Sequence, residues 1–179
     1  MRKLPCTQTL KDGTQILIRD VARGDRALVE AGFAHLSDRS RFLRFLTPRK
    51  QLTERELDVL TDPTDEDDVA IGAVTVPGRG QTSMPIGLAR FIRLTPGGNK
   101  AEFALTVVDT FQGKGAGRLL LRALAHRARH CGVQEFLAYL HRDNRAMRGL
   151  LESYGATRTT AGRTEIEMTA SVAIIADLR

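Results

Sequence analysis

The spacing of apolar and polar residues changes along the chain, and each spacing predicts a different kind of element. Apolar residues that alternate with polar ones, or that form short β-branched runs, predict strands, whereas apolar residues at every third or fourth position predict helices. Strands are predicted at residues 14–21, 69–76, 86–94, 101–108 and 134–140. Helices are predicted at residues 25–36, 37–46, 53–61, 115–131 and 144–154.

A capping box marks the start of one of these helices. In Thr53-Glu54-Arg55-Glu56, Thr53 can cap the first turn and the Glu56 side chain can reach back to it. Asp62-Pro63 ends the same helix, because the residue before a proline disfavours the helical conformation. The sequence therefore predicts both ends of the helix at 53–61.

Turns and chain ends complete the predicted organisation. Proline- and glycine-rich turns at 77–80 and 96–99 join the three strands around them into an antiparallel meander. Residues 156–169 fit a closing hairpin, whereas residues 171–179 give no clear prediction. Residues 1–13 carry little pattern, so we expect a flexible lead-in followed by one α+β domain from residue 14 onward.

The composition is that of an ordinary globular protein. Apolar residues make up 42% of the 179 residues and charged residues 27%, which is enough to fill one hydrophobic core. No apolar run approaches the ~20 residues of a membrane-spanning helix, and the charged start lacks the apolar stretch of a secretory signal. Cys6 and Cys131 match no metal spacing, and the four histidines show no ligand pattern. We therefore expect reduced thiols, a cytoplasmic location and no metal.

The net charge of +6 favours an anionic partner. A phosphate-rich cofactor, a nucleic acid and a membrane surface would each satisfy this preference. Charge alone does not choose among them.

The turn between the strand at 101–108 and the helix at 115–131 carries the clearest chemical signal. Gln112-Gly113-Lys114-Gly115-Ala116-Gly117-Arg118 opens the helix. The first amides of a helix lack intrahelical partners and carry partial positive charge, and glycines let an anion approach the backbone closely. Lys114 and Arg118 add full charges. The segment predicts a pyrophosphate site, and the alternative is a tight turn without a ligand.

Two familiar phosphate loops do not fit this segment. A Walker loop requires glycine where Val108 stands, and Ser or Thr where Gly115 follows Lys114. A dinucleotide fingerprint requires Gly or Ala where Arg118 stands, and it opens a βαβ unit rather than following a meander. Neither loop accounts for the segment.

The spacing Gln112-x-x-Gly115-x-Gly117 after a strand resembles the acetyl-CoA motif of the GNAT acetyltransferases, Q/R-x-x-G-x-G/A. The order of the predicted elements beyond residue 13 resembles theirs too. Within that superfamily the chain is similar to the catalytic domain of the bacterial Pat-type protein lysine acetyltransferases. The similar stretches are Ser40–Phe45, Ala101–Val107, Asp143-Asn144 with Met147, and Tyr154–Ala156.

The resemblance implies a fold and a cofactor site. The fold is the α+β GNAT fold, a mixed central sheet flanked by helices, with an antiparallel N-terminal meander and a splayed parallel pair at the acyl-CoA site. Backbone groups of Thr106, Val107 and Val108 would pair with the pantetheine arm of acetyl-CoA, and Asn144 would contact its far side. The pyrophosphate would be held by the amides of Gln112, Gly113, Lys114, Gly115, Ala116, Gly117 and Arg118. No metal is implied.

By resemblance, Glu102 matches the glutamate that acts as general base in the Pat-type enzymes. A lysine amine has a reference pKa of ~10.4, so about 4.6 kcal/mol separates it at pH 7 from its nucleophilic form. A carboxylate near the thioester could take that proton. The alternative is a solvent-facing residue at the start of a strand.

The tyrosine that many GNAT enzymes use as general acid has no counterpart at its usual position, which Leu151 occupies. Tyr154 lies three residues further on, and we expect it to pack into the core. A coenzyme A thiolate can leave at neutral pH without much help.

The sequence thus predicts an N-acyltransferase that moves an acetyl group from acetyl-CoA to a primary amine, with a protein lysine as the first choice of acceptor. A small amine or amino-sugar acceptor, and a non-catalytic acyl-CoA sensor, stay open as alternatives. A nucleic-acid-binding module would explain the charge but not Glu102, and 5% aromatic residues without tryptophan offer few stacking surfaces. We expect neither a nucleic acid nor a membrane as partner, and the sequence leaves the oligomeric state open.

Overall fold

The computed structural model describes residues 4–63, 66–78, 80 and 82–178. Within these ranges the chain forms an eight-stranded sheet in the order β1-β2-β3-β4-β5-β6-β8-β7. The strands are β1 (Cys6–Thr9), β2 (Gln15–Asp20), β3 (Asp68–Thr75), β4 (Pro85–Arg93), β5 (Lys100–Val107), β6 (Glu135–His141), β7 (Thr157–Ala161) and β8 (Glu165–Ser171). The helices are α1 (Arg26–Ala34), α2 (Asp38–Phe45), α3 (Glu54–Thr61), α4 (Ala116–His130), α5 (Arg145–Glu152) and α6 (Val172–Asp177), with short 3-10 helices η1 (Arg23–Asp25) and η2 (Asp109–Phe111).

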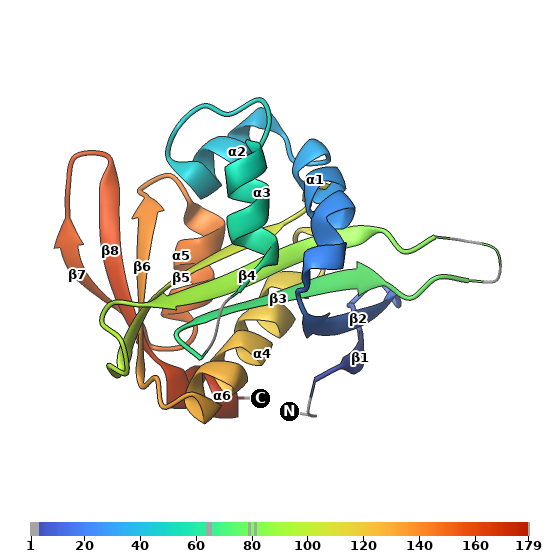
Figure 1. Cartoon of the computed structure of the whole chain (residues 1–179). Coiled ribbons are helices and arrows are strands. Elements are labelled where there is room, and N and C mark those ends of the chain that lie inside the picture. Colours follow the sequence, from blue (N-terminus) through green and yellow to red (C-terminus); the bar gives the residue numbers. More distant parts are fainter. Residues whose placement is uncertain (1–3, 64–65, 79, 81, 179) are drawn as a thin grey trace.

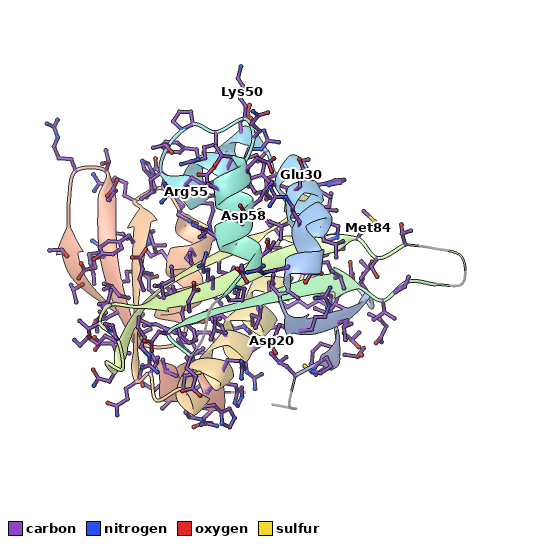
Figure 2. The ribbon with its side chains drawn as sticks, viewed as in Figure 1. Asp20, Glu30, Lys50, Arg55, Asp58 and Met84 are labelled. Carbon is purple, nitrogen blue, oxygen red and sulfur yellow. The ribbon has the colours of Figure 1, made fainter. Side chains whose placement is uncertain are left out.

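Separate sets of helices cover the two faces of the sheet. Helices α1, α2 and α3 lie over one face, and α4 and α6 lie against the other (Figure 1). On the α4 face the rings of Phe91 in β4 and Phe103 in β5 both lie near the ring of Phe136 in β6, with centroid distances of 6.0 and 4.9 Å. Side chains on the outer surface of the first set, such as Arg55 and Asp58 of α3, point away from the sheet (Figure 2).

The expected lead-in at residues 1–13 instead contains a strand. β1 pairs with β2 in antiparallel register, Cys6 opposite Ile18, and the side chains of Cys6 and Leu10 are buried. Local pattern misses this strand because it offers only these two apolar anchors, and its stability comes from pairing with β2. Residues 1–3 lie outside the described residues.

The predicted helix ends are largely confirmed. At the start of α3, Glu56 N donates to Thr53 Oγ1 at 3.3 Å, and Thr53 N donates to Glu56 Oε2 at 2.9 Å, so both halves of the capping box are present. In the segment 171–179, for which we made no prediction, Val172–Asp177 form α6, and the side chain of Ser171, the last residue of β8, caps this helix. Residue 179 lies outside the described residues. The predicted turn at 77–80 includes Arg79, which lies outside the described residues.

The sheet opens between β5 and β6, its parallel pair. Pairing runs only from Lys100 opposite Glu135 to Glu102 opposite Leu137. β5 then continues to Val107 with its other edge paired to β4, while β6 pairs with β8. The two strands therefore separate just beyond Glu102, and the backbone of β5 past this point faces an opening rather than a neighbouring strand.

Candidate functional site

Two cavities meet where β5 and β6 separate. The larger cavity, of about 450 Å³, is bordered by β5, the glycine-rich turn, the start of α4 and α5. The smaller cavity, of about 230 Å³, lies between the end of α2 and the strands β5 and β6, and Glu102 is part of its wall. They share the lining residues Leu43, Arg44, Leu105, Asn144 and Met147. A ligand in the larger cavity can thus reach a second molecule in the smaller one.

The glycine-rich turn presents unused backbone donors to the larger cavity. Gly113 and Gly115 have φ angles of 73° and 96°, a left-handed conformation that favours glycine, and Gly115 is the N-cap of α4. The N–H groups from Gly113 to Arg118 have no backbone acceptor among the described residues. A helix start with free donors suits an anion such as a pyrophosphate.

Most of the residues that the sequence indicated come together here. The larger cavity is lined by Thr106, Val107, Gln112, Gly113, Gly115, Gly117, Arg118 and Asn144. Val108 instead lines an apolar cavity of about 90 Å³ under α1 and α3, and Ala116 is buried in the core. Asn144 Oδ1 accepts a bond from Met147 N at 3.1 Å, so this side chain also caps α5.

Lys114 is engaged elsewhere. Its Nζ lies 3.0 Å from Asp12 Oδ2, and hydrogen bonding from Lys114 lowers the pKa of the Asp12 carboxyl to about 2. Lys11, next to Asp12, lines the larger cavity, and its N–H donates to the Lys114 carbonyl at 3.0 Å. Sequence reasoning missed Lys11, because no local pattern marks the hairpin that carries it.

Arg118 lines the larger cavity from the first turn of α4. Its Nη2 donates to Ser153 Oγ at 3.1 Å, and its guanidinium lies 5.1 Å from the centre of the Tyr154 ring. Tyr154 is buried, as predicted. Arg118 is thus held between the cavity and the end of α5, with its charge on the cavity side available to a phosphate.

A polar network joins α2 to the turn. Asp109 accepts bonds from Ser37 N at 3.0 Å and from the hydroxyls of Ser37 and Ser40 at 2.8 Å each. Burial opposes ionisation of Asp109, but these donors outweigh it and lower the pKa of the carboxyl. Gln112 Nε2 donates to Val107 O at 3.0 Å and to Ser40 Oγ at 3.3 Å. The network fixes α2 over the cavities, and sequence reasoning did not identify Ser37 or Asp109.

Glu102 stands at the point where the strands separate. Its side chain is exposed and lines the smaller cavity. Its charge reaches two neighbouring groups, Arg44 of α2 and Tyr139 of β6. Desolvation and the charges of Glu167 and Glu102 raise the pKa of the Tyr139 phenol. A carboxylate in this place can accept a proton from a molecule in the smaller cavity.

A mixed sheet whose parallel pair splays open beside a glycine-rich helix start defines the fold of the acyl-CoA-dependent N-acyltransferases. The acetyltransferase (GNAT) domain family matches residues 15–157, and the chain belongs to this family. The predicted α+β GNAT fold is confirmed. Acetyl-CoA is the co-substrate typical of the family.

Comparison with individual proteins gives the same result. The chain is 34% identical over 152 residues to acetyltransferase Pat of Mycolicibacterium smegmatis, which is 85% of this chain and 44% of that protein. It is 31% identical over 148 residues to acetyltransferase PA5475 of Pseudomonas aeruginosa, 83% of this chain and 78% of the relative. The crystal structure of the GNAT domain of S. lividans PAT superposes with a TM-score of 0.83 at 25% identity, covering 93% of this chain and 96% of that one.

The described residues show neither a membrane-spanning helix nor a metal site. No helix among them has the length and apolar character needed to cross a bilayer. No group of three or more His, Cys, Asp or Glu residues in the described ranges is placed to hold a metal ion.

Proposed function

We propose that this protein transfers the acetyl group of acetyl-CoA to the side-chain amine of a protein lysine, with Glu102 as the general base. One observation carries the proposal: a cavity bordered by free helix-start amides meets a second cavity that contains a carboxylate. The similarity to Pat supports a lysine acceptor, although the chain spans only 44% of the length of that relative.

The larger cavity has the features that acetyl-CoA requires. The free amides of Gly113 to Arg118 hold the pyrophosphate, and Lys11 and Arg118 add positive charge at the cavity wall. The backbone of Thr106 and Val107 pairs with the pantetheine arm at the open edge of β5. Asn144 lines the opposite wall. The thioester then lies at the junction with the smaller cavity.

The reaction follows from this placement. Glu102 takes a proton from the acceptor ammonium, which leaves a nucleophilic amine. The amine nitrogen attacks the thioester carbonyl carbon, the C–S bond breaks, and coenzyme A leaves as the thiolate. The nitrogen, positively charged after the attack, gives its second proton to this thiolate, which becomes the thiol. Glu102 passes the first proton to solvent, and the product amide carries no charge.

The surface around the smaller cavity suits a protein acceptor. On the side of α1 to α3 the helices stop short of β7 and β8 (Figure 1), so this part of the sheet is open. Ile92 and Tyr139 are 47% and 45% exposed there. Glu167, opposite Tyr139 in the β6–β8 register, adds a second carboxylate near Tyr139, whose phenol also feels the charge of Glu102. An open apolar surface with acidic groups matches a basic peptide segment better than an enclosed small molecule.

A small amine is the second candidate acceptor, because the smaller cavity of about 230 Å³ could also hold one. We also propose a cytoplasmic location, which the free cysteines Cys6 and Cys131 support.

The test combines a binding measurement, product analysis, and one variant with its matched control. Calorimetry measures acetyl-CoA binding, and mass spectrometry follows acetyl groups added to a panel of acyl-CoA synthetases, peptides and small amines. Glu102→Gln should lower kcat at pH 7 by about 10²–10⁴-fold, while the Kd for acetyl-CoA changes less than about twofold. Glu135→Gln, a change of the same kind at the paired start of β6, is the matched control and should keep full activity.

Each part of the proposal has its own contradicting result. Acetylation of small amines alone would rule out the lysine acceptor. Full turnover by Glu102→Gln would rule out the base. A folded protein that takes up no acetyl-CoA would end the proposal as a whole.

A further inference from the structure

Arg44 lies at the place where the cavities around the opening come together. Its side chain lines the larger cavity, the smaller cavity and the apolar cavity under α1 and α3. Among the residues that the larger and smaller cavities share, Leu43, Leu105 and Met147 are apolar and Asn144 is neutral. Arg44 is therefore the charged group at the place where a thioester and an attacking amine would meet.

The guanidinium of Arg44 has no polar partner within the described ranges. It forms no hydrogen bond or ion pair with any described residue, and its recorded contact is the Phe45 ring, 5.1 Å from its Cζ. Arg41, one turn earlier on α2, differs in this respect because it donates to the carbonyls of Phe33 and Ala34 at 3.3 and 3.2 Å. The Arg44 side chain is partly buried. Withdrawing a cation from water without giving it a polar partner is costly, so a site that keeps one there suits a ligand group.

The surroundings of Arg44 keep its guanidinium protonated and fix the helix that carries it. Burial lowers the pKa of its guanidinium to about 10. The negative charge of Glu102 acts in the opposite direction and raises this pKa, and the positive charge of Arg90 lowers it by a smaller amount. The side chain is thus protonated at neutral pH. The helix that carries it is fixed at both ends, by the Asp109 network at its start and by Leu46 at its end, whose backbone holds the left-handed φ of 58°. A left-handed conformation is strained for a non-glycine residue, so the surrounding structure must hold Leu46 in it.

We propose that Arg44 donates hydrogen bonds to the thioester carbonyl oxygen of acetyl-CoA and stabilises the negative charge that forms there during acyl transfer. This inference rests on the proposed function, since it assumes that acetyl-CoA occupies the larger cavity. When the amine nitrogen bonds to the carbonyl carbon, the electron pair of the C=O π bond moves to oxygen. The oxyanion then re-forms the carbonyl, the C–S bond breaks, and the sulfur leaves as thiolate, which takes the second proton from the nitrogen. A preorganised cation with little water around it lowers the barrier to the first of these steps.

A guanidinium suits this role for a physical reason. Its charge is already in place, so the site does not reorganise when the oxyanion forms. Its planar donors can reach the oxygen while the side chain stacks on Phe45. Glu102 lies close enough to influence Arg44, so the base and the oxyanion donor border the same small space.

Three variants test the inference. Arg44→Gln removes the charge, and Arg44→Lys keeps the charge but lacks the planar set of N–H donors of a guanidinium. Arg39→Gln, on the exposed side of α2, is the matched control. We expect Arg44→Gln to lower kcat by about 10²–10³-fold with the Kd for acetyl-CoA within about twofold, and Arg44→Lys to fall between it and the wild type. Arg39→Gln should behave as the wild type. Arg44→Gln should melt at the same temperature as the wild type or higher, because it removes a partly buried charge without a polar partner, whereas a purely structural role would lower the melting temperature.

A second readout separates this inference from the identity of the acceptor. Slow hydrolysis of acetyl-CoA without any amine passes through the same kind of oxyanion, so Arg44→Gln should lower it by a similar factor. Hydrolysis by a wild type that acetylates no protein would contradict the lysine acceptor and still test Arg44. A kcat within about threefold of wild type, or a loss found only in the Kd for acetyl-CoA, overturns the inference. A wild type that binds acetyl-CoA but never releases thiol overturns both.

Discussion

At the scale of single residues, the glycines of the turn differ in what they allow. Gly115 has a φ of 96°, where any side chain is strained, and the Lys11 side chain lies 3.8 Å from the position of an added Cβ. A Cβ on Gly117 would instead meet side-chain atoms of Leu105, Val107 and Leu150 at 3.7 Å, which is ordinary contact. Gly115, like Gly113 with its φ of 73°, therefore demands glycine for backbone reasons, whereas Gly117 does not.

The first prediction follows from this difference. Gly115→Ala should destabilise the fold by about 1–2 kcal/mol and weaken acetyl-CoA binding, because the strained turn moves its amides. Gly117→Ala should bind acetyl-CoA nearly as well as the wild type. Thermal melts and calorimetry on both variants check the prediction, and equal effects of the two substitutions would contradict it.

At the scale of elements, α2 is held over the cavities by one carboxylate. Asp109, in η2, accepts bonds from the Ser37 backbone and from the hydroxyls of Ser37 and Ser40, at the N-terminal end of α2. These bonds place Leu43 and Arg44 above the opening. The orientation of the helix therefore depends on the ionised state of Asp109.

The second prediction concerns this carboxylate and pH. Asp109→Asn should cost about 1–3 kcal/mol of stability at pH 7, since charged acceptors form stronger bonds than amides. The pKa of Asp109 is lowered in the folded state, so its contribution is present above the unfolded value of about 3.9 and is lost as the pH falls through the lower folded value. The difference between wild type and variant should thus be constant from pH 5 to 7 and shrink below pH 4. Denaturant melts at several pH values measure it, and a difference that grows in acid would refute the assignment.

At the scale of the whole molecule, the larger cavity brings together residues that are far apart in the chain, from Lys11 to Leu150. Lys11 comes from the β1–β2 hairpin, Thr106 from β5 and Asn144 from the start of α5. No local segment contains the site. Its electrostatics therefore depend on the docking of the N-terminal hairpin against the turn, which the bond between Lys11 N and Lys114 O records.

The third prediction tests the part that the hairpin plays. Lys11→Ala should weaken acetyl-CoA binding by about fivefold at low salt, a loss of about 1 kcal/mol that is typical of one exposed ion pair. The effect should fade as ionic strength rises, because salt screens exposed charges. Lys50→Ala, at the far side of the α2–α3 loop where the side chain points into solvent (Figure 2), is the control. Calorimetry at two salt concentrations decides, and equal affinities of Lys11→Ala and the wild type at low salt would exclude a role for Lys11.

The spacing of apolar residues predicted well which segments are helices and which are strands, because that spacing follows from burying one face of each element. Strand 101–108 became β5 (Lys100–Val107), and helix 144–154 became the shorter α5 (Arg145–Glu152), whose end depends on packing. β1 escaped prediction because it is stabilised by a neighbouring strand rather than by its own pattern. The same holds for the polar contacts of Asp109, whose partners in α2 lie about seventy positions earlier in the chain.

The sequence by itself determined the order of elements from β2 to α5 and the glycine-rich helix start, because both rest on residue type at short range. It indicated the carboxylate of Glu102 through the resemblance to the Pat-type enzymes. Only the tertiary structure decided that β5 and β6 part just beyond Glu102, that Lys11 borders the cavity, and that Arg44 is the charged residue common to both cavities. The reason is physical: period and turn chemistry act between neighbours in the chain, whereas a cavity and the charges within it arise from contacts between distant segments.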